Sequence, residues 1–198
     1  RSISNIAFPN KRIGKDGIKS FKGKYLKGKW LRECSEKLYK MIQLIRKSKG
    51  PVFVYSNFKE YAGLKAFQKV LESYNFKNFK NHGIGKNRYA LWSGDETLHY
   101  KEQLRVLFNN KKNMNADYIK VFLGSPSIKE GVSLLRVEQV HIMEPYWNIS
   151  RVDQVIGRAI RYCSHKDVPK SRKKVNVFMY HSIHFKEKIT IDENIYEL

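Results

Sequence analysis

Apolar residues recur along the chain at spacings that alternate between those of helices and those of buried strands. From Trp30 to Ile45 they lie three and four residues apart, which predicts a helix that ends before Gly50 and Pro51. Helical spacing returns at 58–74, 97–109 and 154–161. Short apolar runs predict strands at 52–55, 89–92, 119–123, 140–143 and 175–180. This alternation predicts an α/β fold, a mostly parallel sheet with helices on both faces.

Polar residues follow three of the predicted strands. Ser56 and Asn57 come directly after strand 52–55, residues 124–130 follow strand 119–123, and Glu144 and Pro145 follow strand 140–143. Because the carboxyl ends of parallel strands lie at one edge of a sheet, we expect the candidate chemistry to collect along that edge.

The octet 154–161 (QVIGRAIR) carries the most informative pattern in the chain. As a helix it places Gln154, Arg158 and Arg161 on one face, and Gly157 lets another group approach the backbone closely. The other face is covered by Val155, Ile156, Ala159 and Ile160. Two forked guanidiniums on a rigid helix suit a polyphosphate whose charge grows during phosphoryl transfer. The alternative is a solvated basic face in a strongly basic chain.

The charge balance points to a polyanionic partner. The chain has 198 residues, a length that suits one domain, with 39 Lys and Arg against 18 Asp and Glu. A surplus of this size repels itself in the folded state, and nucleic acid is the leading partner because each neutralised phosphate releases counterions. An anionic membrane surface is the alternative, although no apolar run is long enough for a membrane span or a signal peptide.

Three regions are expected along the chain. Residues 1–29 form a basic arm or interdomain segment, 30–191 the folded domain, and 192–198 the start of a helix that continues in a longer protein. The stretch 11–29, with eight Lys or Arg, one Asp and four Gly, is expected to be mobile and unpacked. It serves either as a solvated linker or as a direct contact to phosphates.

The two cysteines are expected in helices, as small apolar side chains. Two thiols in a soluble basic chain suit a reducing compartment. Cys163 and His165, together with His181 and His184, offer an alternative zinc site. Their spacing matches none of the common structural zinc sites, so no metal centre is expected.

Four segments follow one another in an order typical of one protein family. Strand 52–55 ends in SN, the pair SG at 93–94 precedes a helix ending in FN, GSPSIKEGVSL at 124–134 precedes the strand HIME, and the octet follows. Together they resemble the second, C-terminal RecA-like domain of superfamily 2 helicases, over roughly residues 50–182. Three segments, EGVSL at 130–134, VHIMEPYWN at 140–148 and VDQVIGRAIR at 152–161, resemble the corresponding segments of large cytoplasmic DNA virus helicases. These include the poxvirus early transcription factor small subunit and nucleoside triphosphate phosphohydrolase I, with African swine fever virus and mimivirus relatives.

The resemblance implies a RecA-like three-layer fold and a role for each motif. Arg158 and Arg161 would be arginine fingers, with Gln154 holding the phosphates or an arginine. The segment carrying Glu130, Gly131 and Ser133 would contact ATP. Contacts to the nucleic-acid backbone are implied for Ser56, Asn57, Ser93, Gly94, Ser125, Ser127 and Lys129. Many family members carry Thr-Asp at the position of Ser125-Pro126 and Arg-Gly-x-Asp at the position of residues 130–133. This chain has no Asp at the end of the second motif, which puts the direct nucleotide contact made by that Asp in doubt here.

The sequence has neither a GxxxxGK[ST] phosphate loop nor an Asp-Glu-x-His-type Mg²⁺ site. ATP and Mg²⁺ would therefore be bound mainly by the N-terminal RecA-like domain of the same polypeptide, and this chain alone is expected to be inactive. The expected partners are nucleic acid, DNA more than RNA, and viral transcription machinery, with no membrane. The virion and host cytoplasm are the implied location if the chain is viral, and an intracellular, soluble protein is expected if it is not. The alternative function is a basic nucleic-acid-binding module without an ATPase role.

Two aromatic residues near the sheet edge are expected to be structural. Trp147 is expected to pack and not to stack on a base, and His141 to be a satisfied interior or edge histidine of its strand.

Overall fold

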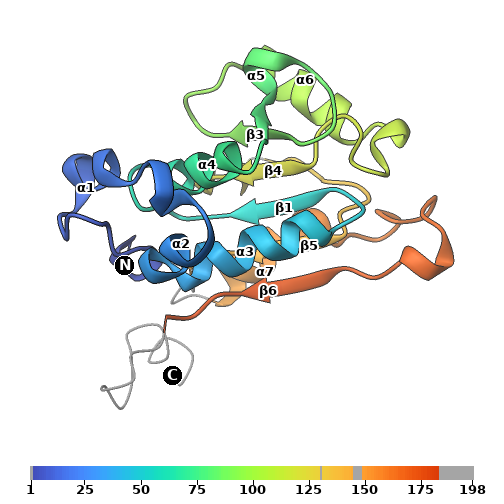
Figure 1. Cartoon of the computed structure of the whole chain (residues 1–198). Coiled ribbons are helices and arrows are strands. Elements are labelled where there is room, and N and C mark those ends of the chain that lie inside the picture. The colour runs from blue at the N-terminus through green and yellow to red at the C-terminus, as the bar shows by residue number, and fades with distance from the viewer. Residues whose placement is uncertain (1, 130, 145–148, 183–198) are drawn as a thin grey trace.

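The computed structural model describes residues 2–129, 131–144 and 149–182 (Figure 1). The expected helix at 192–198, the zinc candidate His184, and the residues Glu130, Pro145 and Trp147 lie outside the described residues.

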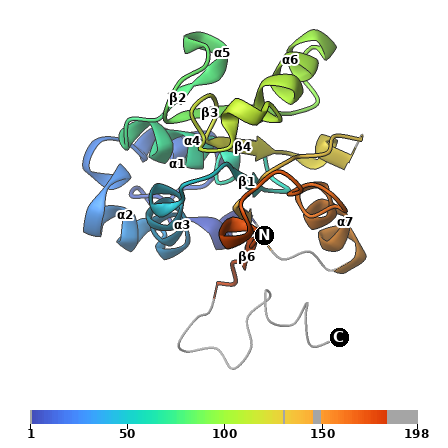
Figure 2. The ribbon, with the colours of Figure 1, turned by 90° about the vertical axis from the view of Figure 1, so that its right-hand side faces the viewer.

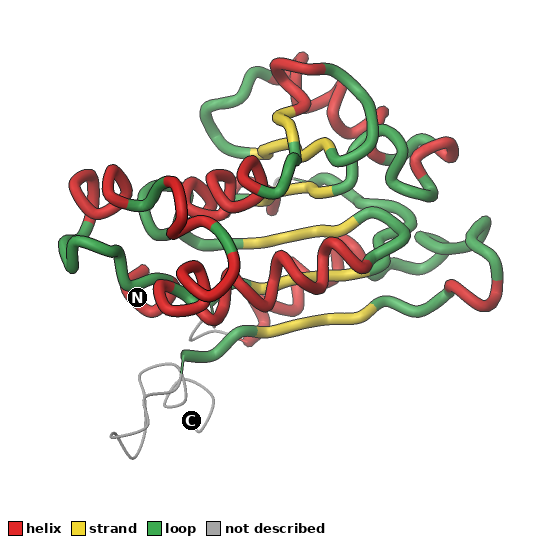
Figure 3. The backbone as a smooth tube through the Cα atoms, in the orientation of Figure 1, coloured by secondary structure: helices red, strands yellow, loops and turns green. Residues whose placement is uncertain are grey.

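Six parallel strands form one sheet in the order β2-β3-β4-β1-β5-β6. The strands are β1 (Val52–Tyr55), β2 (Lys77–Asn78), β3 (Arg88–Trp92), β4 (Val121–Gly124), β5 (Gln139–Ile142) and β6 (Asn176–Met179). The five predicted strands are confirmed within one or two residues at each end, and Figure 3 shows them side by side. Only β2, which is two residues long, was not predicted.

Helices cover both faces of the sheet, as predicted (Figure 2). On one face lie α2 (Gly28–Cys34), α3 (Glu36–Lys47) and α4 (Leu64–Ser73), and on the other α6 (Leu98–Phe108) and α7 (Ile149–Ala159). The alternation of β1 separates two hydrophobic clusters: Val52 and Val54 face α3 and α4, while Phe53 and Tyr55 face α6 and α7. The α/β, three-layer prediction is therefore confirmed.

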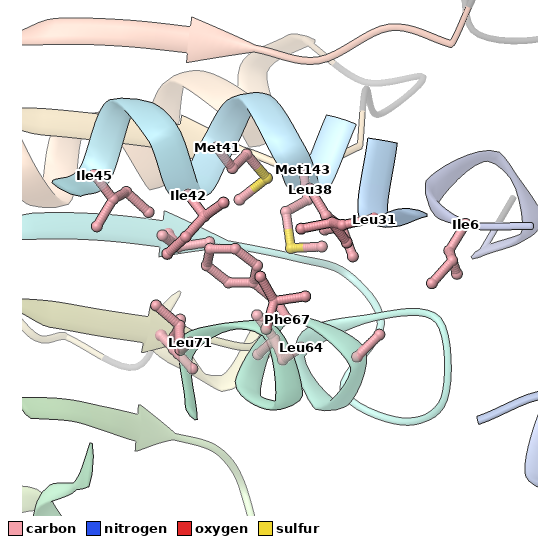
Figure 4. Packing of buried hydrophobic residues seen from close by; sticks show 14 of the residues in the cluster. Ile6, Leu31, Leu38, Met41, Ile42, Ile45, Leu64, Phe67, Leu71 and Met143 are labelled. Carbon is pink, nitrogen blue, oxygen red and sulfur yellow. The ribbon is translucent and has the colours of Figure 1, made fainter. Parts of the chain in front are cut away.

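The first cluster fills the space between β1, α3 and α4 (Figure 4). Its fully buried side chains include Leu38, Met41, Ile42 and Ile45 from α3 and Leu64, Phe67 and Leu71 from α4. These positions follow the helical spacing of the sequence, so the buried face of each helix is set by its apolar residues.

Two predicted helices begin or break differently. The helix expected to run unbroken from Trp30 is interrupted at Ser35, which is extended and accepts a hydrogen bond from the Leu38 amide at 3.0 Å, capping α3. The helix expected from residue 58 begins only at Leu64. A Cβ at Gly63 would lie 1.8 Å from the Phe58 carbonyl oxygen, because the preceding loop folds tightly against this glycine.

The expectation of a mobile, unpacked basic segment at 11–29 is wrong. The segment forms α1 (Gly14–Ser20) and the 3-10 helix η2 (Gly23–Leu26), and Ile18 and Phe21 are buried in the first cluster. The Lys69 ammonium of α4 donates to the carbonyl oxygens of Ile18 at 2.8 Å and Phe21 at 3.0 Å. The prediction followed the many lysines of this segment and overlooked its two apolar side chains, Ile18 and Phe21, which lie three residues apart. The domain boundary expected at residue 29 stays a prediction.

No helix among the described residues is long and apolar enough to cross a membrane. Cys34 is buried in α2, as predicted. Cys163 is exposed in a turn beyond the end of α7, with a φ of 62°, so its predicted helical position is wrong. Over the part of the chain that the structure describes, no group of three His, Cys, Asp or Glu side chains is placed to hold a metal ion.

Candidate functional site

The carboxyl ends of β1, β3, β4 and β5 lie at one edge of the sheet. In register, Gly124 stands beside both Tyr55 and Trp92. The ladder continues one residue further, since the Ser56 amide donates to the Gly124 carbonyl at 3.2 Å and the Ser125 amide to the Trp92 carbonyl at 3.0 Å. The structure thus brings Ser56 and Ser125 together, as the parallel topology predicted, and places Ser93 beside them. We call Ser56, Asn57, Ser93, Gly94, Ser125 and Ser127 the strand-end group.

Ser125 and Ser127 face each other across a tight turn. Residues Pro126–Lys129 form the 3-10 helix η4, and the two hydroxyl oxygens lie 3.1 Å apart. The turn is fixed to the core because Ile128 is fully buried and its amide donates to the Ser125 carbonyl at 2.9 Å. Two hydroxyls are therefore held at the end of β4, with Ser127 half-exposed.

Ser93 is buried at the end of β3 with 1% of its surface exposed. Within the described residues, its hydroxyl and the Trp92 indole N–H have no hydrogen-bond partner. A buried donor left in this state costs about 1–3 kcal/mol, so such a group usually has a partner in the functioning protein. Gly94, the next residue, is exposed in the turn that follows.

Ser56 points into the protein. It is fully buried, and its hydroxyl donates to the Glu144 carboxylate at 2.6 Å. The Asn57 amide donates to the other carboxylate oxygen at 3.0 Å. Asn57 itself is half-exposed, and its side-chain oxygen accepts from the Tyr55 hydroxyl at 2.9 Å. Ser56 thus fixes the loop, while Asn57 is accessible at its surface.

Glu144 is the centre of a buried polar network whose role the sequence did not indicate. Only 1% of its surface is exposed, and burial raises the pKa of its carboxyl above the ordinary value. The Asn5 side-chain amide donates to Glu144 and to the Ala62 carbonyl, and its oxygen accepts from the Lys37 ammonium at 3.0 Å. In the sequence, the one feature that pointed to this network is the position of Glu144, an acidic residue directly after the apolar run 140–143.

In the octet, the burial of α7 follows the predicted face in part. Val155 and Ala159 are buried beneath β5, and Ile156 packs against the same cluster. Ile160 is 43% exposed and does not belong to the apolar helix face on which the sequence placed it, because α7 ends at Ala159 and the chain turns away. For the same reason Arg161 lies beyond the helix, whereas Gln154 and Arg158 lie within it.

The structure brings the end of α7 against the segment 131–135. The Leu134 amide donates to the Arg158 carbonyl at 2.8 Å, and the Arg161 guanidinium donates to the Ser133 hydroxyl. Gly131, at the start of this segment, has a φ of 103°, a conformation that favours glycine. We call Ser133, Arg158 and Arg161 the arginine group. Arg158 is half-exposed, and Arg161 and Gln154 are exposed.

A further set of residues fastens these segments together. The Asn109 side chain donates to the Ser133 carbonyl and accepts from the Leu135 amide, both at 2.8 Å. Arg136 makes a bidentate pair with Asp167, at 2.6–3.0 Å, and donates to the Asn109 carbonyl at 2.6 Å. The Arg136 guanidinium lowers the pKa of the Asp167 carboxyl. The position of Asn109 at the helix end was noticed in the sequence, but the Arg136–Asp167 pair was not.

Comparison with known proteins places this arrangement in a family. The family model of the helicase conserved C-terminal domain matches residues 36–163. The chain is 51% identical over 195 residues to the "Putative ATP-dependent RNA helicase R563" of Acanthamoeba polyphaga mimivirus, covering 98% of this chain and 34% of that protein. It is 29% identical over 208 residues to a "Termination factor NPH-I homolog" of African swine fever virus, covering 82% of this chain and 30% of that protein.

Among solved structures, the C-terminal part of the Fun30 ATPase domain is similar, with a TM-score of 0.58 and 16% identity over 92% of this chain and 49% of that one. At this identity the likeness shows the fold alone. The chain spans about a third of the length of the two viral relatives, 34% and 30%. The expected resemblance to mimivirus and African swine fever virus helicases is confirmed, and the chain belongs to the helicase conserved C-terminal domain family.

Proposed function

We propose that the chain is the C-terminal motor domain of a superfamily 2 nucleic-acid-dependent ATPase. The observation that carries this proposal is the arginine group: Arg161 is exposed and hydrogen-bonded to a neutral hydroxyl, beside the half-exposed Arg158. Ser133 orients the Arg161 guanidinium without neutralising it, so its charge stays available for a phosphate. Such arginines stabilise the charge that develops on the transferred phosphoryl group.

ATP and Mg²⁺ would be held mainly by an N-terminal RecA-like domain of the same polypeptide. In this arrangement Arg158 and Arg161 reach the γ-phosphate across the interface between the two domains, and Gln154 holds the phosphates or an arginine. Gly131, Ser133 and Glu130 form the segment that contacts the nucleotide from this side. Mg²⁺ would supply charge neutralisation between the phosphates.

The strand-end group would contact the backbone of the nucleic acid. Asn57, Gly94 and Ser127 are accessible there, whereas the unpartnered Ser93 hydroxyl is buried and would reach a phosphate oxygen only if the turn at Gly94 opens. Ser125 directly precedes the η4 turn, and Lys129 is the last residue of that turn. Because Ser56 is turned toward Glu144, we assign it the positioning of this loop and not a direct contact.

Backbone contacts carry no sequence information, and they leave both DNA and RNA as substrates. DNA was expected more than RNA, whereas the mimivirus relative carries the name of an RNA helicase. The African swine fever virus relative is named a termination factor, which supports a role with viral transcription machinery. A viral motor of this kind would act in the virion and the host cytoplasm.

The proposal is tested by Arg158→Ala in the complete polypeptide, meaning this chain together with its N-terminal RecA-like domain. We expect kcat for ATP to fall by about 10³-fold, while the affinity for single-stranded nucleic acid changes little. Arg105→Ala is the matched control, since Arg105 is an exposed arginine of α6 paired with Glu102.

The opposite result favours the second candidate, a binding module without an ATPase role. That function rests on the net charge of +21 alone. It requires ATP hydrolysis to be unaffected by Arg158→Ala, with a lower affinity for nucleic acid and a smaller salt dependence of binding.

A further inference from the structure

Four cations gather around two aromatic rings on the surface formed by η2, α2 and the ends of α3 and α4. The Lys24 and Lys29 ammoniums lie 4.2 and 5.3 Å from the centroid of the Trp30 ring. The Lys27 ammonium and the Arg46 guanidinium lie 5.8 and 5.2 Å from that of Tyr74. We call these six residues the basic platform. All four cationic side chains are exposed.

We propose that the basic platform is a second binding site for single-stranded nucleic acid, separate from the strand-end group. The inference rests on the proposed function only in taking nucleic acid as the partner.

The platform is built into the fold. Ser73 of α4 donates to the Leu26 carbonyl at 3.1 Å, and the Gly28 amide donates to the Tyr74 hydroxyl at 3.3 Å. Gly28 has a φ of 54°, which turns the chain sharply between Lys27 and Lys29. These contacts hold the basic segment over the end of α4, so the cations occupy defined positions.

The way in which these cations are held leaves their charge available. In the described part of the chain, no ion pair joins any of the four to a carboxylate. A ring face attracts an ammonium through its quadrupole but does not neutralise it. Two like charges on each ring repel one another, and a bound anion would relieve that repulsion.

The chemistry favours a single-stranded nucleic acid over other polyanions. Its phosphates neutralise lysines in succession, and its bases stack on partly exposed rings. Trp30 is 37% exposed, and a base that stacks on its ring would displace a lysine ammonium from the ring face toward the phosphate beside that base.

The platform lies on the face of the sheet covered by α2, α3 and α4, whereas the arginine group follows α7 on the other face (Figure 2). A strand bound there would therefore not occupy the place of the nucleotide.

The test is a salt titration of the chain with fluorescein-labelled 20-residue oligothymidylate and oligouridylate, followed by anisotropy. Replacing Lys24, Lys27 and Lys29 by Gln removes three phosphate contacts. At about 0.7 per contact on single strands, the slope of log affinity against log salt should become shallower by about 2.

The matched control replaces Lys111, Lys112 and Lys170 by Gln, three exposed lysines of η3 (Lys111–Asn113) and η5 (Lys170–Arg172). It makes the same change in net charge, and we expect its slope to change by much less. Equal effects of the two triple variants would overturn the proposal, because they would show that binding follows total charge and not the platform.

A second pair of variants leaves the charge unchanged. Trp30→Ala should weaken oligonucleotide binding by about fivefold or more, since one stacked ring contributes about 1–3 kcal/mol, and Trp30→Phe should retain most of it. Equal affinities of Trp30→Ala and the unaltered chain would overturn the stacking contact.

Sedimentation with vesicles that contain phosphatidylserine tests whether the platform is a membrane-binding surface and not a nucleic-acid site. Platform-dependent sedimentation with such vesicles at physiological salt, combined with an unchanged oligonucleotide slope, would overturn the proposal in favour of a membrane partner. Failure of the platform test leaves the ATPase result for Arg158→Ala untouched, so the two proposals fail separately.

Discussion

Asn109 joins two segments that are far apart in the sequence. Its side chain satisfies the Ser133 carbonyl and the Leu135 amide, 24 and 26 residues away, and so fixes the loop against which Arg161 rests. The amide suits this task because it offers a donor and an acceptor side by side.

Asn109→Ala should lower the free energy of unfolding of the chain by about 1–3 kcal/mol, because two backbone groups lose their partners. Urea denaturation measures this loss. Asn81→Ala, the same substitution at an exposed position of α5 (Phe79–His82), should change stability very little. Equal losses for the two variants would show that the Asn109 bridge contributes nothing specific.

At this scale the sequence predicted where side chains lie better than where they point. Ser56 and Ser125 were expected at one edge of the sheet, and the register confirms it; Ser93 lies at the same edge, although the edge prediction did not include it. The inward direction of Ser56 depends on Glu144, 88 residues away, and no local pattern reports that distant partner. The roles of Arg158 and Arg161 stay predictions.

Among the strands, β5 carries a fully buried histidine. The Gln139 amide nitrogen donates to the Leu44 carbonyl, so its oxygen accepts from His141 Nε2 at 3.0 Å. His141 Nδ1 then accepts from the Tyr180 hydroxyl at 2.7 Å, and the ring stacks on Phe178. His141 was expected to be a satisfied interior or edge histidine, and the structure shows the interior one. Both nitrogens are used by the neutral ring, and burial lowers the pKa of His141 to about 3.

This histidine makes the stability of the sheet depend on pH. The unfolded chain binds its proton near the ordinary pKa of 6.5, and the folded chain only near 3. The contribution of neutral His141 to the free energy of unfolding is therefore complete above pH 6.5 and is lost as the pH falls toward 3. Between pH 6.5 and 5 the free energy of unfolding should fall by about 2 kcal/mol.

Urea denaturation at several pH values tests this dependence, with His141→Gln as the comparison. In the variant, the free energy of unfolding should not show the fall of about 2 kcal/mol between pH 6.5 and 5 that we assign to His141. The raised pKa of Glu144 acts in the opposite direction, since its contribution is present below its ordinary pKa of 4.5 and is lost as the pH rises through the folded pKa. The Glu144 contribution is the same in the unaltered chain and in His141→Gln. Parallel curves of the free energy of unfolding against pH for the two proteins would contradict the role given to His141.

The elements themselves were predictable where apolar periodicity is long. Strands β1 and β3 to β6 follow their short apolar runs, and helix α6 and most of α7 follow their apolar periodicity, because burial of these residues decides the local structure. The break at Ser35 and the packed segment around Phe21 were missed. Both depend on tertiary contacts, to Asn5 and to Lys69 respectively, that a local pattern does not contain.

For the molecule as a whole, ATP hydrolysis should require a second domain. The chain offers arginines but neither a phosphate loop nor a Mg²⁺ site in its sequence. We expect the isolated 198 residues to release phosphate from ATP at the rate of the buffer blank, with or without oligonucleotide. The complete polypeptide is the positive control, and robust turnover by the isolated chain would contradict the assignment.

The central place of β1 has a consequence for how the protein is made. Both of its neighbours, β4 and β5, come later in the chain, and residues 56–120 separate Tyr55 from Val121. At about 5–20 residues per second, a ribosome needs about 3–13 seconds to supply the first partner. Through that interval the nascent chain carries four apolar residues, Val52–Tyr55, with no strand to pair with. Such a segment is a natural target for chaperones and a hazard for aggregation when synthesis is fast.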